Sequence, residues 1–310
     1  MSTTDTAAAA GPQPFTLPRK PHYVTLAADC DFFALFQKIE RRFDTCYMLE
    51  SLGEDSHMAR HSIIGFDPEY TLYANGTTLT IENRDGDAKH YQSDNPYELL
   101  RSLIPQNIIS RKYAGGLSGY LGYDAMQYFE PSLTLKASDD FDTFRFGLYK
   151  DGLILDKMTG EVTYFYYDNS RYAFLQTLID ADDEPAGPLH ITALGDTMSK
   201  AEHAEAVAKV KQDIIDGKVF QCEVGFKKRF RIQGDTLALY DQLRTINPSP
   251  QMYYVKFGEQ KLIGASPELL FRLRQGEMET FPLAGTTLRG QTPQEDTQLA
   301  RALLNDPKEI

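Results

Sequence analysis

The amino-acid sequence predicts an α+β fold in which large antiparallel sheets have helices laid against them. Three observations support this prediction. Short apolar runs alternate with turn residues, one run of alternating apolar and polar residues is unusually long, and a few segments show the period of a helix. The 310 residues are enough for about two domains, and 42% apolar with 25% charged residues is the composition of a soluble globular protein.

The first part of the chain, residues 20–180, is expected to form an N-terminal domain built from strands. The run EYTLYANGTTLTIEN predicts a hairpin around Asn75-Gly76, because this dipeptide favours a two-residue hairpin turn. The run FGLYKDGLILDKMTGEVTYFYYD predicts two more hairpins, at 150–152 and at 159–160.

Composition divides the rest of the chain. Residues 1–19 contain a four-alanine run and no basic segment at their start, which predicts a disordered tail and not a signal peptide. Helices are expected at 30–42 and 96–104. Residues 181–197 are acidic and contain two prolines, which predicts a linker. Residues 198–310 then form a second domain.

The second domain opens with strong local signals. Ser199 and Glu202 form a capping box that starts a helix, and Gly217 ends it. The run VFQCEVGFKKRFRI alternates apolar and polar residues and predicts one long strand, with Cys222 on its apolar side as a core residue. The runs MYYVKFGEQKLIGAS and LLFRLRQGEMETFPLAG predict two further hairpins.

Charge and hydropathy exclude several classes of function. The net charge of −12 and the pI of about 5.0 argue against nucleic acid, whose phosphates require a basic surface. No stretch approaches the roughly 20 apolar residues of a membrane span, so no membrane association is expected. Together with the lack of a signal peptide, this predicts a cytoplasmic protein. The three cysteines form no C-x-x-C pair and predict neither a disulfide framework nor a zinc site.

Generic catalytic motifs are absent from the sequence, but a few positions are suited to chemistry. Glu268 enters a strand after a proline, where a partly desolvated carboxyl group would have a raised pKa and act as a general acid. An ordinary carboxylate at a strand edge is the simpler alternative. Gln221, on the polar side of the long strand, can orient a nucleophile but cannot deprotonate one. Gly285 and Thr286 offer a backbone N–H and a hydroxyl to a small anion.

Several segments, taken in order, resemble one family. They are CYMLESLGEDSHMARHSIIGFDP, GGLSGYLGYD, IIDGKVFQCEVGFKKRF, NPSPQMYYVKF, GASPELLFRL, PLAGTTLRGQTPQED and LLNDPKEI. From about residue 20 to the last residue the chain resembles the chorismate-utilising enzymes, and most closely the anthranilate synthase component I (large subunit) family. The resemblance implies large antiparallel sheets packed as a sandwich with helices on the outside.

The resemblance gives the candidate residues their roles. Gly285 and Thr286 match positions that hold chorismate, and Glu268 matches the acid that helps the 4-hydroxyl depart. Gln221 stands where water-using members have a lysine that deprotonates water, which favours ammonia as the nucleophile. Ala284 stands where many aminodeoxychorismate synthases have a nucleophilic lysine. These two positions favour direct amination at C2 and elimination of pyruvate, which gives anthranilate, the first step of tryptophan biosynthesis.

Two strips resemble the family's site for L-tryptophan as a feedback inhibitor. The matching residues are Leu49, Glu50 and Ser51 in the first strip, and Asn247, Pro248, Pro250, Gln251, Met252 and Tyr253 in the second. Met252 is expected to line the indole pocket, whereas Gln251 replaces a tyrosine that is common there. Without the resemblance, both strips are turns between strands. Inhibition from such a remote site would be allosteric.

The resemblance also implies a magnesium ion and a partner subunit. The family's E-x-x-E metal helix is represented by its first glutamate, Glu309, and the chain stops before the second. The family's catalytic histidine also lies further on, so the chain is expected to be C-terminally truncated and inactive alone. No amidotransferase signature is present. Ammonia is therefore expected from a separate glutamine amidotransferase subunit (component II) in a hetero-oligomer.

Two other functions stay open at this point. The first is a different chorismate amination enzyme, which makes aminodeoxychorismate or aminodeoxyisochorismate. Ala284 argues against the former product, and the mass of the product separates the possibilities. The second is a non-catalytic protein that binds tryptophan, whose signature is tryptophan binding in a chain without turnover.

Overall fold

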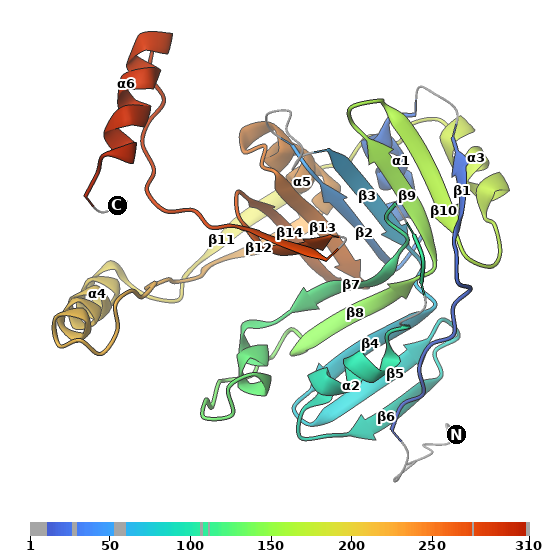
Figure 1. The fold of residues 1–310 in the computed structure, drawn as a ribbon, viewed down its shortest axis with the longest axis horizontal. Coiled ribbons are helices and arrows are strands. Elements are labelled where there is room, and N and C mark those ends of the chain that lie inside the picture. Colours follow the sequence, from blue (N-terminus) through green and yellow to red (C-terminus); the bar gives the residue numbers. More distant parts are fainter. Residues whose placement is uncertain are drawn as a thin grey trace. The chain divides into compact units, whose positions relative to one another are not determined.

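The computed structural model describes residues 11–26, 30–52, 60–105, 108–110, 112–274 and 276–307 (Figure 1). By its internal contacts the chain forms two compact units, which are Met1–Asp183 with Leu243–Ile310, and Glu184–Gln242. Antiparallel sheets and helices make up both units, so the predicted α+β class is confirmed.

The largest sheet of the first unit has seven antiparallel strands in the order β1-β10-β9-β3-β2-β13-β14 (Figure 1). The bounds of these strands are β1 (His22–Thr25), β2 (Thr45–Glu50), β3 (His61–Phe66), β9 (Asp151–Asp156), β10 (Glu161–Tyr166), β13 (Gln251–Phe257) and β14 (Gln260–Ser266). The β9–β10 and β13–β14 hairpins were both predicted and are confirmed. Because β13 pairs with β2, this sheet extends across the predicted linker at 181–197, and the domain boundary there stays a prediction.

A second sheet of the same unit has five strands in the order β6-β5-β4-β8-β7. The bounds are β4 (Tyr70–Asn75), β5 (Thr78–Asn83), β6 (Ala88–Gln92), β7 (Gly116–Leu121) and β8 (Phe144–Tyr149). The hairpin predicted at Asn75-Gly76 joins β4 to β5. Gly76 has a φ of 57° in this turn, a left-handed conformation that glycine adopts without strain.

Side chains from both sheets meet in one buried cluster. Tyr47 of β2 and Val255 and Phe257 of β13 come from the seven-stranded sheet, and Tyr149 of β8 comes from the five-stranded sheet. The rings of Tyr47 and Tyr149 meet edge to face with their centroids 4.7 Å apart, a favourable geometry for two aromatic rings. The predicted sandwich of antiparallel sheets is therefore confirmed.

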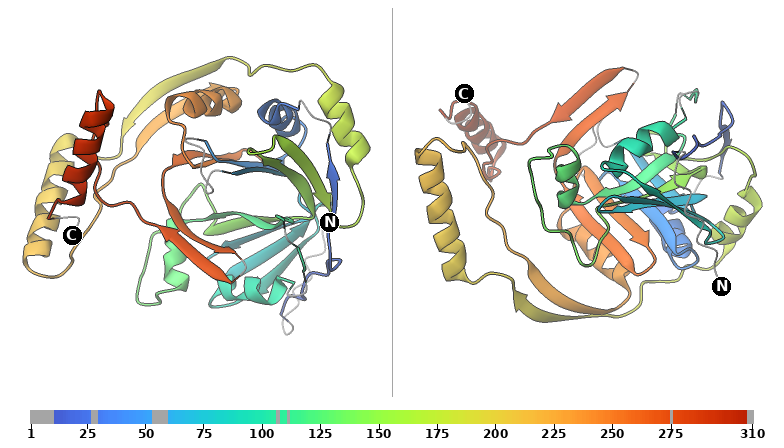
Figure 2. Two further views of the ribbon diagram at one scale, coloured as in Figure 1. Left: turned by 45° about the horizontal axis from the view of Figure 1, so that its top comes forward. Right: turned by 90° about the horizontal axis from the view of Figure 1, so that it is seen from below.

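Helices cover the outer faces of this sandwich (Figure 2). They are α1 (Phe32–Glu40), α2 (Pro96–Leu103), the 3-10 helix η1 (Tyr123–Tyr128) and α3 (Tyr172–Asp180). Two further helices, α5 (Thr236–Ile246) and α6 (Pro293–Leu304), follow later in the chain. The helices predicted at 30–42 and 96–104 are confirmed as α1 and α2. The Asp31 side chain caps α1, and the ring of Phe36 packs against Tyr254 of β13 at 5.4 Å.

The second unit contains α4 (Lys200–Ile215) and a two-stranded sheet of β11 (Leu189–Asp196) and β12 (Lys228–Gly234). The predicted capping box is present, because Ser199 and Glu202 each accept a hydrogen bond from the other's backbone N–H. The composition of 181–197 predicts a linker, but residues 189–196 of this segment form a strand. These residues form β11, because the prolines and the acidic run end before them.

The long strand predicted over 219–232 was wrong in its first half. Only the part from Lys228 onward is a strand, because the pairing of β11 with β12 ends at Asp196 and Lys228. The residues before Lys228 have no strand beside them among the described residues. Cys222 is consequently exposed, and the prediction that it fills the core was wrong.

The chain passes between the two sheets of the first unit at two places. Asp67 lies between β3 and β4, and Asp151 opens β9 directly after β8 ends at Tyr149. The hairpin predicted at 150–152 was therefore wrong. Its turn residues send the chain from the five-stranded sheet into the seven-stranded sheet, where β9 pairs with β3 and β10.

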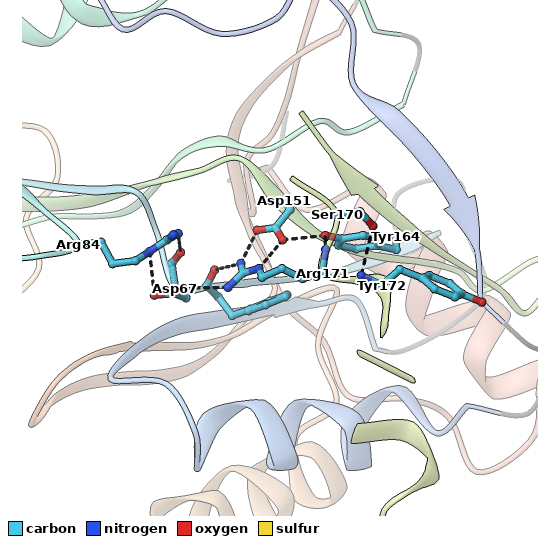
Figure 3. Close-up of polar contacts among 8 residues, drawn as sticks. Asp67, Arg84, Asp151, Tyr164, Ser170, Arg171 and Tyr172 are labelled. Atoms are coloured by element: carbon cyan, nitrogen blue, oxygen red, sulfur yellow. Dashed lines mark hydrogen bonds and ion pairs between the residues drawn. The ribbon is translucent and has the colours of Figure 1, made fainter. Parts of the chain in front are cut away.

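One arginine between β10 and α3 binds both crossing points (Figure 3). Arg171 donates to the two carboxylate oxygens of Asp151 at 2.7 and 2.5 Å, and to Asp67 at 2.7 Å. The hydroxyl of Tyr164 donates to Asp151 at 2.9 Å and accepts from the Arg171 backbone N–H at 2.8 Å. The guanidinium also lies 4.2 Å from the ring centroid of Phe66. Asp151 is 7% exposed, so this arginine supplies the charge that a buried carboxylate requires.

A second buried carboxylate attaches α1 to the sheet. Glu40, the last residue of α1, is 5% exposed, and its Oε1 atom accepts from the Tyr254 hydroxyl at 2.9 Å. The ammonium groups of Lys261 and Lys256 lie 3.0 and 3.4 Å from the same oxygen. Burial alone would raise the pKa of Glu40, but the hydrogen bond and charge of Lys261, with the charge of Lys256, lower it below its ordinary value.

We predict that Arg171→Ala strongly destabilises the first unit. The substitution leaves Asp151 buried without a partner and frees both crossing points, so we expect a loss of about 3 kcal/mol in the free energy of unfolding. Urea denaturation followed by circular dichroism measures this loss. The matched control is Arg84→Ala, since Arg84 is half-exposed and binds Asp67 from outside at 3.1 Å; its loss should stay below about 1 kcal/mol. Equal losses in the two variants would contradict the assignment.

We predict that Glu40 stabilises the fold at neutral pH and not in acid. A carboxyl group with a lowered pKa in the folded state stabilises the protein above its unfolded pKa of about 4.3, and this contribution is lost as the pH falls through the folded pKa. Glu40→Gln should therefore lower the urea midpoint at pH 7, with the difference from wild type shrinking below about pH 4. Glu259→Gln, at an exposed position, is the control. A difference that is independent of pH would refute the role of the charge.

Candidate functional site

Three of the residues predicted to act on chorismate, Glu268, Gly285 and Thr286, lie around one hairpin of the first unit. The hairpin consists of β15 (Leu269–Arg274) and β16 (Glu277–Phe281), as predicted. Glu268 directly precedes β15, and its backbone N–H donates to the hydroxyl of Ser266 at 3.2 Å. The backbone N–H of Leu283, just after β16, donates to the Glu268 carboxylate at 3.3 Å. The structure therefore brings the predicted acid next to the segment that contains Gly285 and Thr286.

The side chains of this region are open to solvent. Glu268, Ala284 and Thr286 are exposed, and Gly285 is half-buried. The exposure of Glu268 agrees with the simpler alternative, an ordinary carboxylate at a strand edge. The segment after β16 is itself exposed, and it supplies one backbone N–H without covering the carboxyl group.

The far end of this segment is fixed by the start of α6. Arg289 donates to both carboxylate oxygens of Asp296, with distances between 2.8 and 3.1 Å. The Gly290 backbone N–H donates to the same carboxylate at 2.8 Å, and the Arg289 hydrogen bond lowers the pKa of Asp296. Thr292 caps the helix as predicted, because its side chain accepts from the Glu295 backbone N–H at 3.2 Å. The segment that contains Gly285 is thus held between β16 and α6.

Gln221 belongs to the second unit, where it is exposed. It lies in the irregular stretch before β12 and not on the polar face of a strand, so that part of its prediction was wrong. The stretch is attached to α4 through His203, whose Nε2 atom lies 2.9 Å from the carbonyl oxygen of Val224. The predicted role of Gln221 in orienting a nucleophile stays a prediction.

The two strips predicted to bind tryptophan are neighbours in the seven-stranded sheet. In the pairing of β2 with β13, Glu50 lies opposite Met252 and Leu49 lies opposite Tyr253. The contact continues beyond the strands, where the Leu52 backbone N–H donates to the carbonyl oxygen of Ser249 at 2.9 Å. Two segments far apart in the sequence thus form one surface, although their role in binding stays a prediction.

The burial of these residues differs along the strips. Glu50 is 7%, Ser51 9% and Met252 1% exposed, whereas Leu49 and Tyr253 are partly exposed. Asn247 and Pro248 are exposed, and Pro250 and Gln251 are half-buried. The ring of Tyr253 packs over Gly264 of β14, where a Cβ atom would lie 2.2 Å from the ring. These differences separate a buried side, with Glu50 and Met252, from a more open side.

The sequence did not predict the basic side chains that bind residues of the first strip. Arg244, in the last turn of α5, donates to the two carboxylate oxygens of Glu50 at 2.7 and 2.9 Å. Its guanidinium lies 4.1 Å from the ring centroid of Phe33 in α1. Lys157, just after β9, donates to the carbonyl oxygen of Ser51 at 2.9 Å. The position of Arg244 three residues before the second strip was the only sequence signal for its role.

The structure gives no test of a magnesium site at Glu309, which lies outside the described residues. Within the described part of the chain, no three His, Cys, Asp or Glu side chains gather as they would to hold a metal ion. A search of the same residues finds no helix with the length and apolar character needed to cross a bilayer.

A match to a family model gives the class of protein. Residues 31–310 match the family described as chorismate binding enzyme. Because the match covers most of the chain, this chain belongs to that family. The resemblance seen in the sequence is thereby confirmed at the level of the family.

Two curated relatives with the same name illustrate the similarity. Anthranilate synthase component 1 of Leptospira biflexa is 44% identical over 301 residues, which cover 95% of this chain and 64% of that protein. Anthranilate synthase component 1 of Methanothermobacter thermautotrophicus is 36% identical over 278 residues, covering 90% and 59% respectively. The chain therefore spans about three fifths of the length of these relatives.

Solved structures show the same fold. The crystal structure of anthranilate synthase component I from Streptococcus pneumoniae matches with a TM-score of 0.62 and 24% identity, over 83% of this chain and 60% of that chain. The menaquinone-specific isochorismate synthase MenF from Escherichia coli matches with a TM-score of 0.54 and 15% identity, over 95% and 62%. At these identities the likeness concerns the fold alone.

Proposed function

We propose that the protein acts as an anthranilate synthase component I, which aminates chorismate at C2 with ammonia and eliminates pyruvate to give anthranilate. The observation that carries the proposal is the 44% identity to a relative of that name over 95% of this chain. The relatives are longer than this chain, so the proposal concerns the activity of the whole protein. The reaction is the first step of tryptophan biosynthesis, and a cytoplasmic location follows from the same proposal.

The residues around the β15–β16 hairpin have the chemistry that the first step needs. Glu268 is the proton donor for the departing 4-hydroxyl, which leaves as water. Gly285 and Thr286 present a backbone N–H and a hydroxyl to the substrate, and the anchoring of their segment at both ends favours a fixed geometry. The Leu283 N–H bond to Glu268 supports this arrangement, since it links the proton donor to the substrate-holding segment.

Two positions without a lysine favour anthranilate among the products of the family. Gln221 cannot act as a base toward water, and ammonia needs no base because its nitrogen lone pair is free. Ala284 has no nucleophile that could form a covalent intermediate with the ring. Direct attack of ammonia at C2 is the pathway that both positions allow.

The proposal includes a magnesium ion and a separate glutamine amidotransferase subunit. Magnesium would supply positive charge to the chorismate carboxylate, with Glu309 as one ligand. The amidotransferase would supply ammonia within a hetero-oligomer, because this chain has no amidotransferase signature of its own.

L-Tryptophan is proposed as an allosteric inhibitor bound at the two adjacent strips. The adjacency of Glu50 and Met252 supports the proposal, since one residue offers a carboxylate to an ammonium group and the other an apolar, adaptable wall to an indole ring. Arg244 occupies both oxygens of Glu50, so an incoming ammonium group has to share this carboxylate. Gln251 lies at the edge of the same surface and is expected to tune the affinity.

Two alternative functions can be distinguished from this proposal by experiment. A related enzyme would produce aminodeoxychorismate or aminodeoxyisochorismate, and the family match alone is compatible with this. A non-catalytic tryptophan-binding protein would use the β2–β13 surface alone. The exposure of Glu268 and Thr286 favours this second alternative for the 310-residue chain on its own.

We predict that L-tryptophan binds this chain and that Glu50→Gln weakens binding about 10-fold, the effect of losing one charge-assisted hydrogen bond. Isothermal titration calorimetry measures both dissociation constants. The matched control is Glu259→Gln, an exposed glutamate in the β13–β14 turn of the same unit, which should bind as wild type does. Equal affinities of wild type and Glu50→Gln would remove Glu50 from the proposed site.

We predict that the 310-residue chain forms no anthranilate from chorismate, ammonium and Mg²⁺. Its candidate substrate residues are open to water, and an exposed carboxyl group is a poor general acid at neutral pH. Anthranilate fluorescence above a control without protein would contradict this.

The protein purified from its own source tests the proposed function. Mass spectrometry of the reaction products should identify anthranilate. Aminodeoxychorismate or aminodeoxyisochorismate as the product would support the alternative enzyme.

A further inference from the structure

A cavity of about 590 Å³ lies on the face of the seven-stranded sheet that contains Ile63. Its lining comes from β3, β9 and β10, from the stretch with Lys112 and Tyr113, and from β15. The volume lies within the range of about 300–1,000 Å³ that is typical of small-molecule sites. None of its lining residues belongs to the sets assigned above to chorismate or tryptophan.

The floor of the cavity is apolar and is set by the strand register. Ile63 of β3 and Ile154 of β9 lie directly opposite each other, and Thr163 of β10 continues the same row. Side chains in one cross-strand row stand next to each other on one face of a sheet. The ring of Tyr113 adds a wall, and its hydroxyl is engaged by the Tyr47 hydroxyl at 2.5 Å. A flat apolar group fits such a surface.

The next cross-strand row on the same face of the sheet consists of ionisable residues. Both carboxylates in this row have partners. His61, Asp156 and Glu161 lie opposite one another two residues further along their strands. Asp156 accepts hydrogen bonds from Arg60 at 2.6 and 3.1 Å. Glu161 lies 3.5 Å from the Lys112 ammonium. The acidic groups at the cavity are thus neutralised by neighbours that also line it.

Two further cations of the cavity lining, Arg272 and Arg274, belong to β15. Arg272 is paired with Glu279 across the hairpin, whereas the side chain of Arg274 makes no hydrogen bond or ion pair with any residue that the structure describes. The charged lining residues are four cations, Arg60, Lys112, Arg272 and Arg274, and two anions, Asp156 and Glu161. A chain with a net charge of −12 therefore has a cavity whose own lining carries an excess of positive charge. Such a cavity concentrates anions.

His61 does not supply this charge. Burial lowers its pKa below the ordinary value, and the nearby cations Arg60, Arg274 and Lys112 act in the same direction, although Asp156 opposes them. The imidazole is therefore neutral at pH 7 and offers a hydrogen-bonding group in place of a cation. Arg274 is the forked donor at the cavity that is open to a carboxylate.

We propose that this cavity binds an aromatic monocarboxylate, with the ring on the Ile63–Ile154 floor and the carboxylate on Arg274. The apolar floor disfavours a bare inorganic anion, which would lose hydration there without compensation. The two-part lining instead matches a ligand with one apolar and one anionic end. This inference rests on the cavity alone and does not depend on the proposed catalytic function.

Anthranilate itself is a suitable probe, because it fluoresces and the chain contains no tryptophan whose emission would interfere. Titration of the 310-residue protein, without chorismate, should show saturable binding by fluorescence anisotropy. Arg274→Ala should weaken this binding about 10-fold or more, the effect of losing a charge-assisted hydrogen bond to a carboxylate. Arg274→Lys, which keeps the charge but loses the fork, should have an intermediate affinity.

Two control variants locate the bound probe. Arg301→Ala removes an exposed arginine on α6 and should bind as wild type does. Thr286→Ala alters the proposed chorismate segment and reports whether the probe binds there instead. Loss of binding in Thr286→Ala with full binding in Arg274→Ala would place the probe at the chorismate segment and overturn the proposal. Lack of saturable binding to the wild-type protein at millimolar anthranilate would overturn it as well.

Discussion

Arg171 bridges Asp67 and Asp151, the two residues at which the chain passes between the sheets of the first unit. β3 and β9 are neighbours in one sheet, and their continuations β4 and β8 are neighbours in the other. The two connections therefore run side by side, at Asp67 and at Asp151. Two carboxylates at one corner would repel each other, and the guanidinium between them turns this repulsion into two attractive contacts. Arg171, which holds this corner together, belongs to neither of the two strand pairs.

The surface assigned to tryptophan depends on this corner through strand register. β2 lies between β3 and β13 in the sheet, and Leu49 pairs with Ile63 on one side and with Tyr253 on the other. A shift of β3 by one residue would move its own side chains to the opposite face of the sheet and would disrupt its register with β2. The adjacency of Glu50 and Met252 follows from the pairing of β2 with β13, and β3 pairs with β2 on its other side.

Local sequence signals correctly predicted those elements whose hydrogen-bond partners are close together in the chain. The Asn75-Gly76 hairpin and the Ser199 capping box each place donor and acceptor within a few residues, and both are confirmed. The turn at 150–152 has similar residues, but distant strand pairing decides where its two flanking strands lie. Arg171 and Arg244 could not be predicted as partners, because their carboxylates lie far away in sequence. The two tryptophan strips were found through resemblance to a family, and periodicity alone gave only turns.

The β13–β14 hairpin connects the two proposed sites by a short physical path. Gln251, in the tryptophan strip, lies directly opposite Ser266, and the hydroxyl of Ser266 accepts the backbone N–H of Glu268. Tyr253 packs over Gly264 with no room for a Cβ atom, so the start of β13 cannot move without β14. An allosteric inhibitor requires an element with two arrangements that both ligands contact. Within the described residues the strip and the proposed acid both lie at the open end of this hairpin, so a ligand that displaces Gln251 would act on Glu268 through a single strand pair.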